Sequence, residues 1–124
     1  MKVRISGNKI RFRLKQPEVH QFQQKGSVSE VLEFGSNQND QIKFTLSESN
    51  TSTIDLQFKS NETTVLVPKE QAKEWTSTDL VGFDAEVDTG KGKKIGILVE
   101  KDFMCMDGRE EDNVGSYPNP LASA

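Results

Sequence analysis

Apolar and polar residues alternate along most of the chain, and a period of two residues is typical of strands with one buried face. The alternation is clearest in the first fifteen residues. The pair Gly7-Asn8 interrupts it, and such a pair favours a two-residue hairpin turn because Gly adopts positive φ without steric cost. We therefore predict a hairpin of two strands, residues 2–6 and 9–14.

A two-residue turn also predicts the register of this hairpin. The expected pairs are Ser6 with Lys9, Ile5 with Ile10, Arg4 with Arg11, Val3 with Phe12, and Lys2 with Arg13. One face of the hairpin is then apolar. The other face, which we call the basic face, carries five cations: Lys2, Arg4, Lys9, Arg11 and Arg13. Like charges directly opposite each other cost about 0.2–1 kcal/mol per pair, so this face needs neutralisation.

The rest of the chain predicts two short helices and further strands. Helices are expected at 17–25 and 68–75, each with a proline in its first turn. The strands are expected at 27–34, 41–47, 53–60, 63–67, 81–87 and 94–101. The sequence strand–proline–helix thus occurs twice. The strand at 94–101 is apolar on both faces near Leu98, which predicts a central position or a covering helix.

Pairing of these strands is predicted to be antiparallel throughout. Strand 41–47 is expected to place Leu46 opposite Ile54. Strand 63–67 is expected to place Val65 opposite Phe58, and the last hairpin to pair Phe83, Ala85 and Val87 with Val99, Ile97 and Ile95. The predicted fold is α+β: a twisted antiparallel sheet or half-barrel of seven to eight strands with two short helices. Residues 1–101 form the predicted single domain, and 102–124 an acidic, irregular segment packed on it.

Charge is distributed unevenly along the chain. The first fifteen residues carry six positive charges, so the remainder carries −9 within a total of −3. This acidic balance argues against a nucleic-acid partner. The chain has a single cysteine, Cys105, no apolar run long enough for a membrane span and no apolar leader, which together predict a cytoplasmic protein without membrane contact. The sequence does not indicate an oligomeric state.

Three acids are the predicted internal partners of the basic face. Asp84, Glu86 and Glu100 point away from the apolar face of the last predicted hairpin. The acidic segment after residue 101 is a further source of neutralising charge.

Other motifs have a plain explanation. Asp88-Thr89-Gly90 matches the tripeptide of aspartic proteases, but Lys91 follows it and a polar hairpin loop accounts for it. The sequence places neither a nucleophile nor an orienting carboxylate within reach of His20, as a catalytic base needs. Cys105 lies among acids, which raise a thiol pKa. The acidic run 107–112 lacks the spacing of a calcium loop. No catalytic residue, metal ligand or cofactor is therefore predicted.

The opening stretch 1–14, together with Val99-Glu100-Lys101-Asp102-Phe103, Cys105 and Tyr117-Pro118-Asn119-Pro120, resembles a family of short uncharacterised bacterial proteins over nearly the full length. The resemblance implies a single compact cytoplasmic domain and no particular chemistry. Basic strands also occur in triphosphate-tunnel enzymes, but the first strand here lacks their alternating glutamates.

Three functional hypotheses follow. The first is a non-enzymatic binding domain whose basic face receives an anionic small molecule or an acidic protein surface. The second is an enzyme acting on a phosphorylated small molecule, in which the arginines hold the phosphate and Glu86 or Glu100 supplies acid/base catalysis or a metal ligand. In the third, internal ion pairs neutralise the basic face and its role is purely structural.

Overall fold

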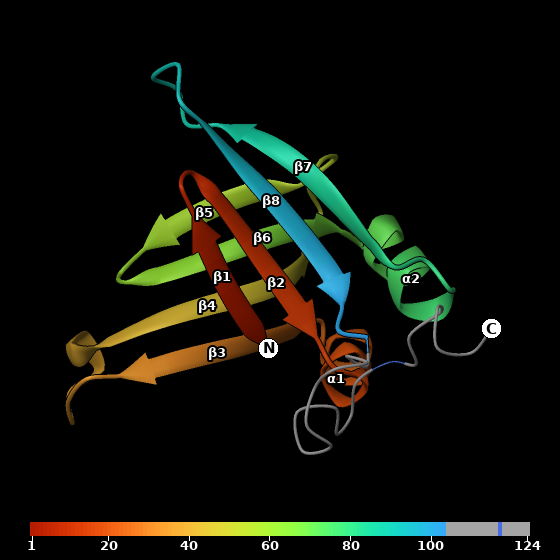
Figure 1. The fold of residues 1–124 in the computed structure, drawn as a ribbon, viewed down its shortest axis with the longest axis horizontal. Coiled ribbons are helices and arrows are strands. Elements are labelled where there is room, and N and C mark those ends of the chain that lie inside the picture. The colour runs from red at the N-terminus through yellow and green to blue at the C-terminus, as the bar shows by residue number, and fades with distance from the viewer. Residues whose placement is uncertain (104–116, 118–124) are drawn as a thin grey trace.

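The structure is a computed structural model, and it describes residues 1–103 and Tyr117. Within them lie eight strands and two α-helices (Figure 1). In chain order these are β1 (Lys2–Ser6), β2 (Lys9–Leu14), α1 (Gln16–Lys25), β3 (Ser27–Glu33), β4 (Gln41–Ser49), β5 (Asp55–Lys59), β6 (Glu62–Pro68), α2 (Lys69–Ser77), β7 (Gly82–Asp88) and β8 (Lys94–Lys101), with a 3₁₀ turn at Gln38–Asp40.

The strands form two four-stranded sheets. Sheet A has the order β1-β2-β8-β7 and sheet B the order β3-β4-β6-β5. The outer pairs of each sheet are antiparallel, whereas the central pairs, β2 with β8 and β4 with β6, are parallel. The prediction of one antiparallel sheet or half-barrel is therefore wrong in its topology, although the mixture of strands with two short helices is confirmed. Period-two patterning identifies the buried face of a strand but not its neighbours.

The two halves of the fold repeat each other. Each half runs strand, strand, helix, strand, strand, and each gives one hairpin to sheet A and one to sheet B. The central registers correspond at a separation of 53 residues: the pair Lys9–Gly96 in sheet A matches the pair Glu62–Lys43 in sheet B. The recurring strand–proline–helix pattern is the sequence trace of this repeat.

The sheets pack face to face with their strands crossing, and both helices lie at one end (Figure 1). The core between them is aliphatic and aromatic. Phe12 of sheet A meets Phe44 of sheet B edge-on, with ring centroids 6.4 Å apart. Fully buried core side chains are Trp75, Phe12, Phe22, Leu14, Leu46, Val65, Val67 and Val99.

Equivalent residues anchor the two helices. Phe22 of α1 and Trp75 of α2 are both buried and pack edge-on, with ring centroids 6.0 Å apart. Helix α1 begins where Glu18 accepts a hydrogen bond from the Lys15 N–H at 2.9 Å. It ends at Gly26, whose φ of 81° places it in the left-handed region that favours glycine.

Two predicted registers are confirmed and two are wrong. The first hairpin pairs as predicted, as does the last, in which Phe83 lies opposite Val99. Strand β4 does not pair with β5; Leu46 lies beside Val65 in a parallel pair instead. Val65 lies opposite Leu56, because the turn before β6 is Ser60-Asn61 and so begins one residue earlier than predicted. Strand β8 is central, between β2 and β7.

Candidate functional site

The basic face lies on the outer face of sheet A. Strand β2 alternates strictly, with Ile10, Phe12 and Leu14 buried and the intervening cations outside the core. Arg4 and Arg11 are directly opposite each other. The five predicted cations are therefore brought together on one face.

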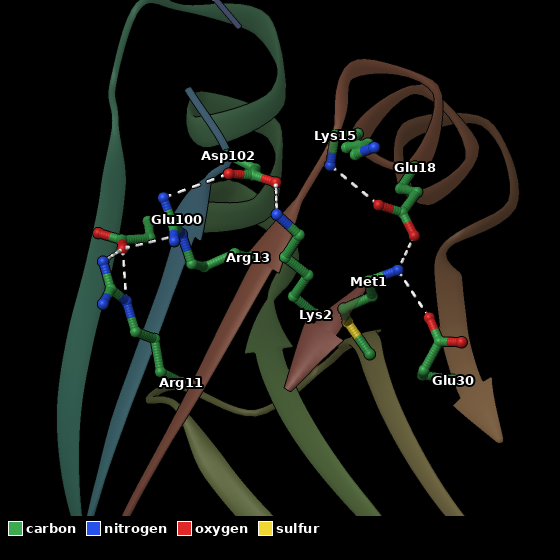
Figure 2. A network of polar contacts seen from close by, with 9 residues as sticks. All are labelled: Met1, Lys2, Arg11, Arg13, Lys15, Glu18, Glu30, Glu100 and Asp102. Carbon is green, nitrogen blue, oxygen red and sulfur yellow. Dashed lines mark hydrogen bonds and ion pairs between the residues drawn. The ribbon is translucent and has the colours of Figure 1, made fainter. Parts of the chain in front are cut away.

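An ion-pair network covers the half of this face near the helices (Figure 2). Arg11 donates to Glu100 through Nη2 and through Nε, the latter at 2.6 Å. Arg13 Nε lies 3.7 Å from the same carboxylate, and Arg13 Nη2 lies 3.2 Å from Asp102 Oδ1. Lys2 Nζ lies 3.1 Å from Asp102 Oδ2. Three of the five cations are thus neutralised within the fold.

Asp102 is the part of this network that sequence reasoning did not single out. It is only 2% exposed, directly after β8, and its N–H donates to the Leu14 carbonyl oxygen at 2.8 Å. The parallel pairing of β2 with β8 brings it beside Arg13 and Lys2. In the sequence, Asp102 directly follows the last residue of β8 and stands two residues after Glu100, so the alternation places both acids on the same side. This position indicates contact with Arg13 and Lys2 only once β2 and β8 are known to be neighbours.

A second cluster fixes the start of β1. The Met1 amino group donates to Glu18 and, at 2.7 Å, to Glu30 (Figure 2). Glu18 thereby connects β1 to the first turn of α1, and Glu30 connects it to β3 of the other sheet.

The other half of the basic face borders a hollow of about 470 Å³ on the outer face of sheet A. Arg4, Lys9 and Arg11 line one side of it, and Asp84 and Glu86 of β7 line the other. Gly96 and Leu98 of β8 lie between the two sides. The hollow therefore has a basic side, an acidic side and a floor without charge.

The three predicted acids are divided between the ion-pair network and the hollow. Glu100 contacts Arg11 and Arg13, as described above. Glu86 lies 3.3 Å from Lys94, an exposed pair on the rim. Within residues 1–103, Arg4, Lys9 and Asp84 form no ion pair.

Lys101 and Tyr117 form a separate buried contact. Lys101 is only 6% exposed. Its Nζ donates to the Thr78 carbonyl oxygen at 2.7 Å, and the same atom lies 5.4 Å from the centre of the Tyr117 ring. Burial lowers the pKa of the Lys101 ammonium, opposed by the field of Asp79, and burial raises the pKa of the Tyr117 phenol. The Tyr117 N–H donates to the Asp102 carbonyl oxygen at 2.7 Å, which holds Tyr117 beside the end of β8.

The remaining sequence motifs add no site. Asp88-Thr89-Gly90 lies at the β7–β8 turn, where Asp88 accepts the Gly90 N–H at 2.7 Å, as expected for a hairpin loop. His20 is exposed on α1. Cys105 and the acidic run 107–112 lie outside the described residues. Within the described ones, no group of three or more His, Cys, Asp or Glu is placed to hold a metal ion.

Fold and surface together define a small α+β protein of two mixed sheets with a charged hollow on one outer face. A family model described as "Family of unknown function (DUF7009)" matches residues 1–121, and the chain belongs to that family. The predicted membership of an uncharacterised family is thereby confirmed. No curated protein and no solved structure matches the chain. No helix among the described residues has the length and apolarity to cross a bilayer.

Proposed function

We propose that the protein binds a small anionic ligand in the hollow of sheet A, through Arg4, Lys9 and Arg11. The observation that carries the proposal is the division of the basic face. Its half near the helices is neutralised by Glu100 and Asp102, whereas Arg4 and Lys9, at the turn end, border a concave space and form no ion pair with any residue in 1–103.

The chemistry of these cations suits an oxyanion. A guanidinium is a planar fork that donates two parallel hydrogen bonds to a carboxylate or phosphate. Glu100 holds the Arg11 guanidinium from the side of Nε and Nη2, which orients the group before a ligand arrives. A ligand of this kind also relieves the repulsion between Arg4 and Arg11, which face each other across the hairpin.

The open hollow limits the expected affinity. Hydrogen bonds to charged groups contribute about 1.5–3 kcal/mol each, and association itself costs several kcal/mol. Two or three such contacts with a small probe, less that cost, predict a Kd on the order of millimolar.

A second candidate function is hydrolysis of a phosphorylated small molecule. It is favoured by the two carboxylates, Asp84 and Glu86, that line the hollow opposite the arginines. In this version the cations hold the phosphate and Glu86 acts as general acid or base. Glu100 is less suited to that role because Arg11 and Arg13 already engage it.

Titration with phenyl phosphate tests both versions. We expect saturable shifts of the backbone amide NMR signals of β1 and β2, with a Kd below about 10 mM. In Arg4→Ala/Lys9→Ala the Kd rises at least about tenfold, because two charge-assisted contacts are lost. Lys25→Ala/Lys59→Ala removes the same charge from exposed positions elsewhere and is the matched control.

Equal binding by the two double variants, or the absence of saturable shifts at β1 and β2, contradicts the binding proposal. Inorganic phosphate that accumulates in the ³¹P spectrum, and stops accumulating in Glu86→Gln, supports the hydrolytic version instead.

A further inference from the structure

The ligand chemistry of the hollow can be taken further by comparison with sheet B, where the repeated fold forms an equivalent place. A hollow of about 260 Å³ there is lined by Gln57, Lys59, Ser60, Glu62 and Thr64. At the separation of 53 residues, Gln57, Glu62 and Thr64 correspond to Arg4, Lys9 and Arg11. The β5–β6 hairpin thus lines a hollow at the place equivalent to the basic side of the hollow in sheet A, but with Gln57, Glu62 and Thr64 where sheet A has three cations.

In sheet B a chain of hydrogen bonds spans the equivalent strands. The Thr45 hydroxyl of β4 lies 2.8 Å from the Ser29 hydroxyl of β3 and donates to Glu62 of β6 at 2.6 Å. Lys43 Nζ lies 3.9 Å from the same carboxylate. These polar groups across β3, β4 and β6 are therefore satisfied by one another.

In sheet A, Leu98 and Lys9 take the positions of Thr45 and Glu62 at the separation of 53 residues. Gly82 stands at that separation from Ser29, but the β7–β8 register is shifted, so that Asp84 lies opposite Leu98 as Ser29 lies opposite Thr45. The bridging hydroxyl is replaced by an apolar side chain, and the position of Lys43 is taken by Gly96. A Cβ at Gly96 would lie 3.1 Å from Lys9 Cγ, so the stem of Lys9 crosses the glycine. The result is a carboxylate and an ammonium of opposite sign, without a bridge between them in the described part of the chain.

We infer that the ligand itself supplies the bridge. It is dipolar, with an anionic group toward Arg4 and Lys9, an ammonium toward Asp84 and Glu86, and an apolar middle over Leu98. The inference rests on the proposed function for the anionic end and adds the cationic end. Like-charge repulsion from the two carboxylates weakens the binding of a purely anionic ligand, whereas an ammonium turns these carboxylates into partners.

The strand geometry sets the length of the ligand. Strands β2 and β7 flank β8, so they are two strand spacings apart, about 10 Å. An extended peptide rises about 3.3 Å per residue, so three residues with free ends span that distance. The structure therefore favours a short peptide, or a zwitterion of similar length, with small apolar side chains.

Three tripeptides of equal length distinguish the contributions of the ammonium and the carboxylate to binding: Ala-Ala-Ala with free ends, its N-acetylated form and its C-terminal amide. We expect the free peptide to bind about tenfold more tightly than either blocked form, because each block removes one charge-assisted contact. Asp84→Asn then reduces the affinity of the free peptide toward that of the acetylated one, whose own affinity does not fall. Glu70→Gln, an exposed acid on α2, is the charge-matched control and changes neither.

Equal binding of the free and acetylated peptides overturns the dipolar ligand and leaves the anion site standing. Binding of phenyl phosphate without binding of any tripeptide also overturns it, again without loss of the anion site. If neither phenyl phosphate nor a tripeptide shifts the signals of β1 and β2, the anion site and the dipolar ligand both fail.

Discussion

A single residue, Asp102, determines how much of the basic face is available. It is buried, and it lies within ion-pair distance of both Lys2 and Arg13. Burying a carboxylate without partners is costly, so this position is stable only with the two cations beside it. Asp102 thereby engages the cations at one end of the basic face in ion pairs. Arg4 and Lys9, at the other end, form no ion pair within residues 1–103.

Asp102→Asn tests this role. The substitution leaves two cations without their shared carboxylate, and breaking a buried pair costs about 3–5 kcal/mol; since Lys2 and Arg13 are partly exposed, we expect a loss of about 2–3 kcal/mol of unfolding free energy. Glu86→Gln removes an exposed pair with Lys94 and should cost less than about 1 kcal/mol. Urea denaturation at pH 7 measures both. Equal losses would show that the burial of Asp102 has no energetic weight.

At the scale of elements, the two halves use the same hairpin with different turn residues. Gly7 has φ of 58° in the β1–β2 turn, and its counterpart in the β5–β6 turn is Ser60 with φ of 52°, followed by Asn61 with φ of 64°. Positive φ at both central residues, as at Ser60-Asn61, is typical of a type I′ turn, whereas in the β1–β2 turn Gly7 alone has positive φ, as in type II′. A serine in the left-handed region is strained by about 1–2 kcal/mol, whereas a glycine is not.

Ser60→Gly should therefore stabilise the protein by about 0.5 kcal/mol, because relief of the strain slightly exceeds the greater chain entropy of glycine when unfolded. Ser6→Gly is the control: it lies in β1 without positive φ, and should destabilise by about 0.5–1 kcal/mol. Thermal or urea unfolding distinguishes the two signs. Destabilisation by Ser60→Gly would indicate that its side chain contributes more than the strain costs.

At the scale of the whole molecule, neither half holds a complete sheet. Each half gives one hairpin to each sheet, and both central parallel pairs, β2 with β8 and β4 with β6, join the two halves. The core contact of Phe22 with Trp75 also crosses between them. An isolated half would have two hairpins with exposed apolar faces, which are marginal in water.

We therefore expect the fragment 1–50 to be unfolded alone and to regain strand structure when mixed with 51–124. Circular dichroism of each fragment and of the equimolar mixture measures this. A folded fragment 1–50 would contradict the interdependence of the halves, and a mixture equal to the sum of its parts would show that the intact loop at 50–54 is needed for assembly.

The sequence by itself determined the local structure. Alternation set which side of each strand is buried, Gly7-Asn8 set the first register, and the prolines with Gly26 placed both helices close to their observed limits. It also placed the five cations on one face. These features depend on residues near one another in the chain. The hydrophobic period and the turn residues are therefore sufficient to predict them.

Only the tertiary structure decided which hairpins are neighbours in each sheet. The pairing of β2 with β8 joins residues more than 80 positions apart. Patterning marks the buried face of a strand, and for β8 a central position, but it does not say which strand lies beside it. That pairing places Asp102 and Glu100 beside Lys2, Arg11 and Arg13. It also sets Asp84 across an apolar floor from Lys9, and so forms the hollow on which the proposed function depends.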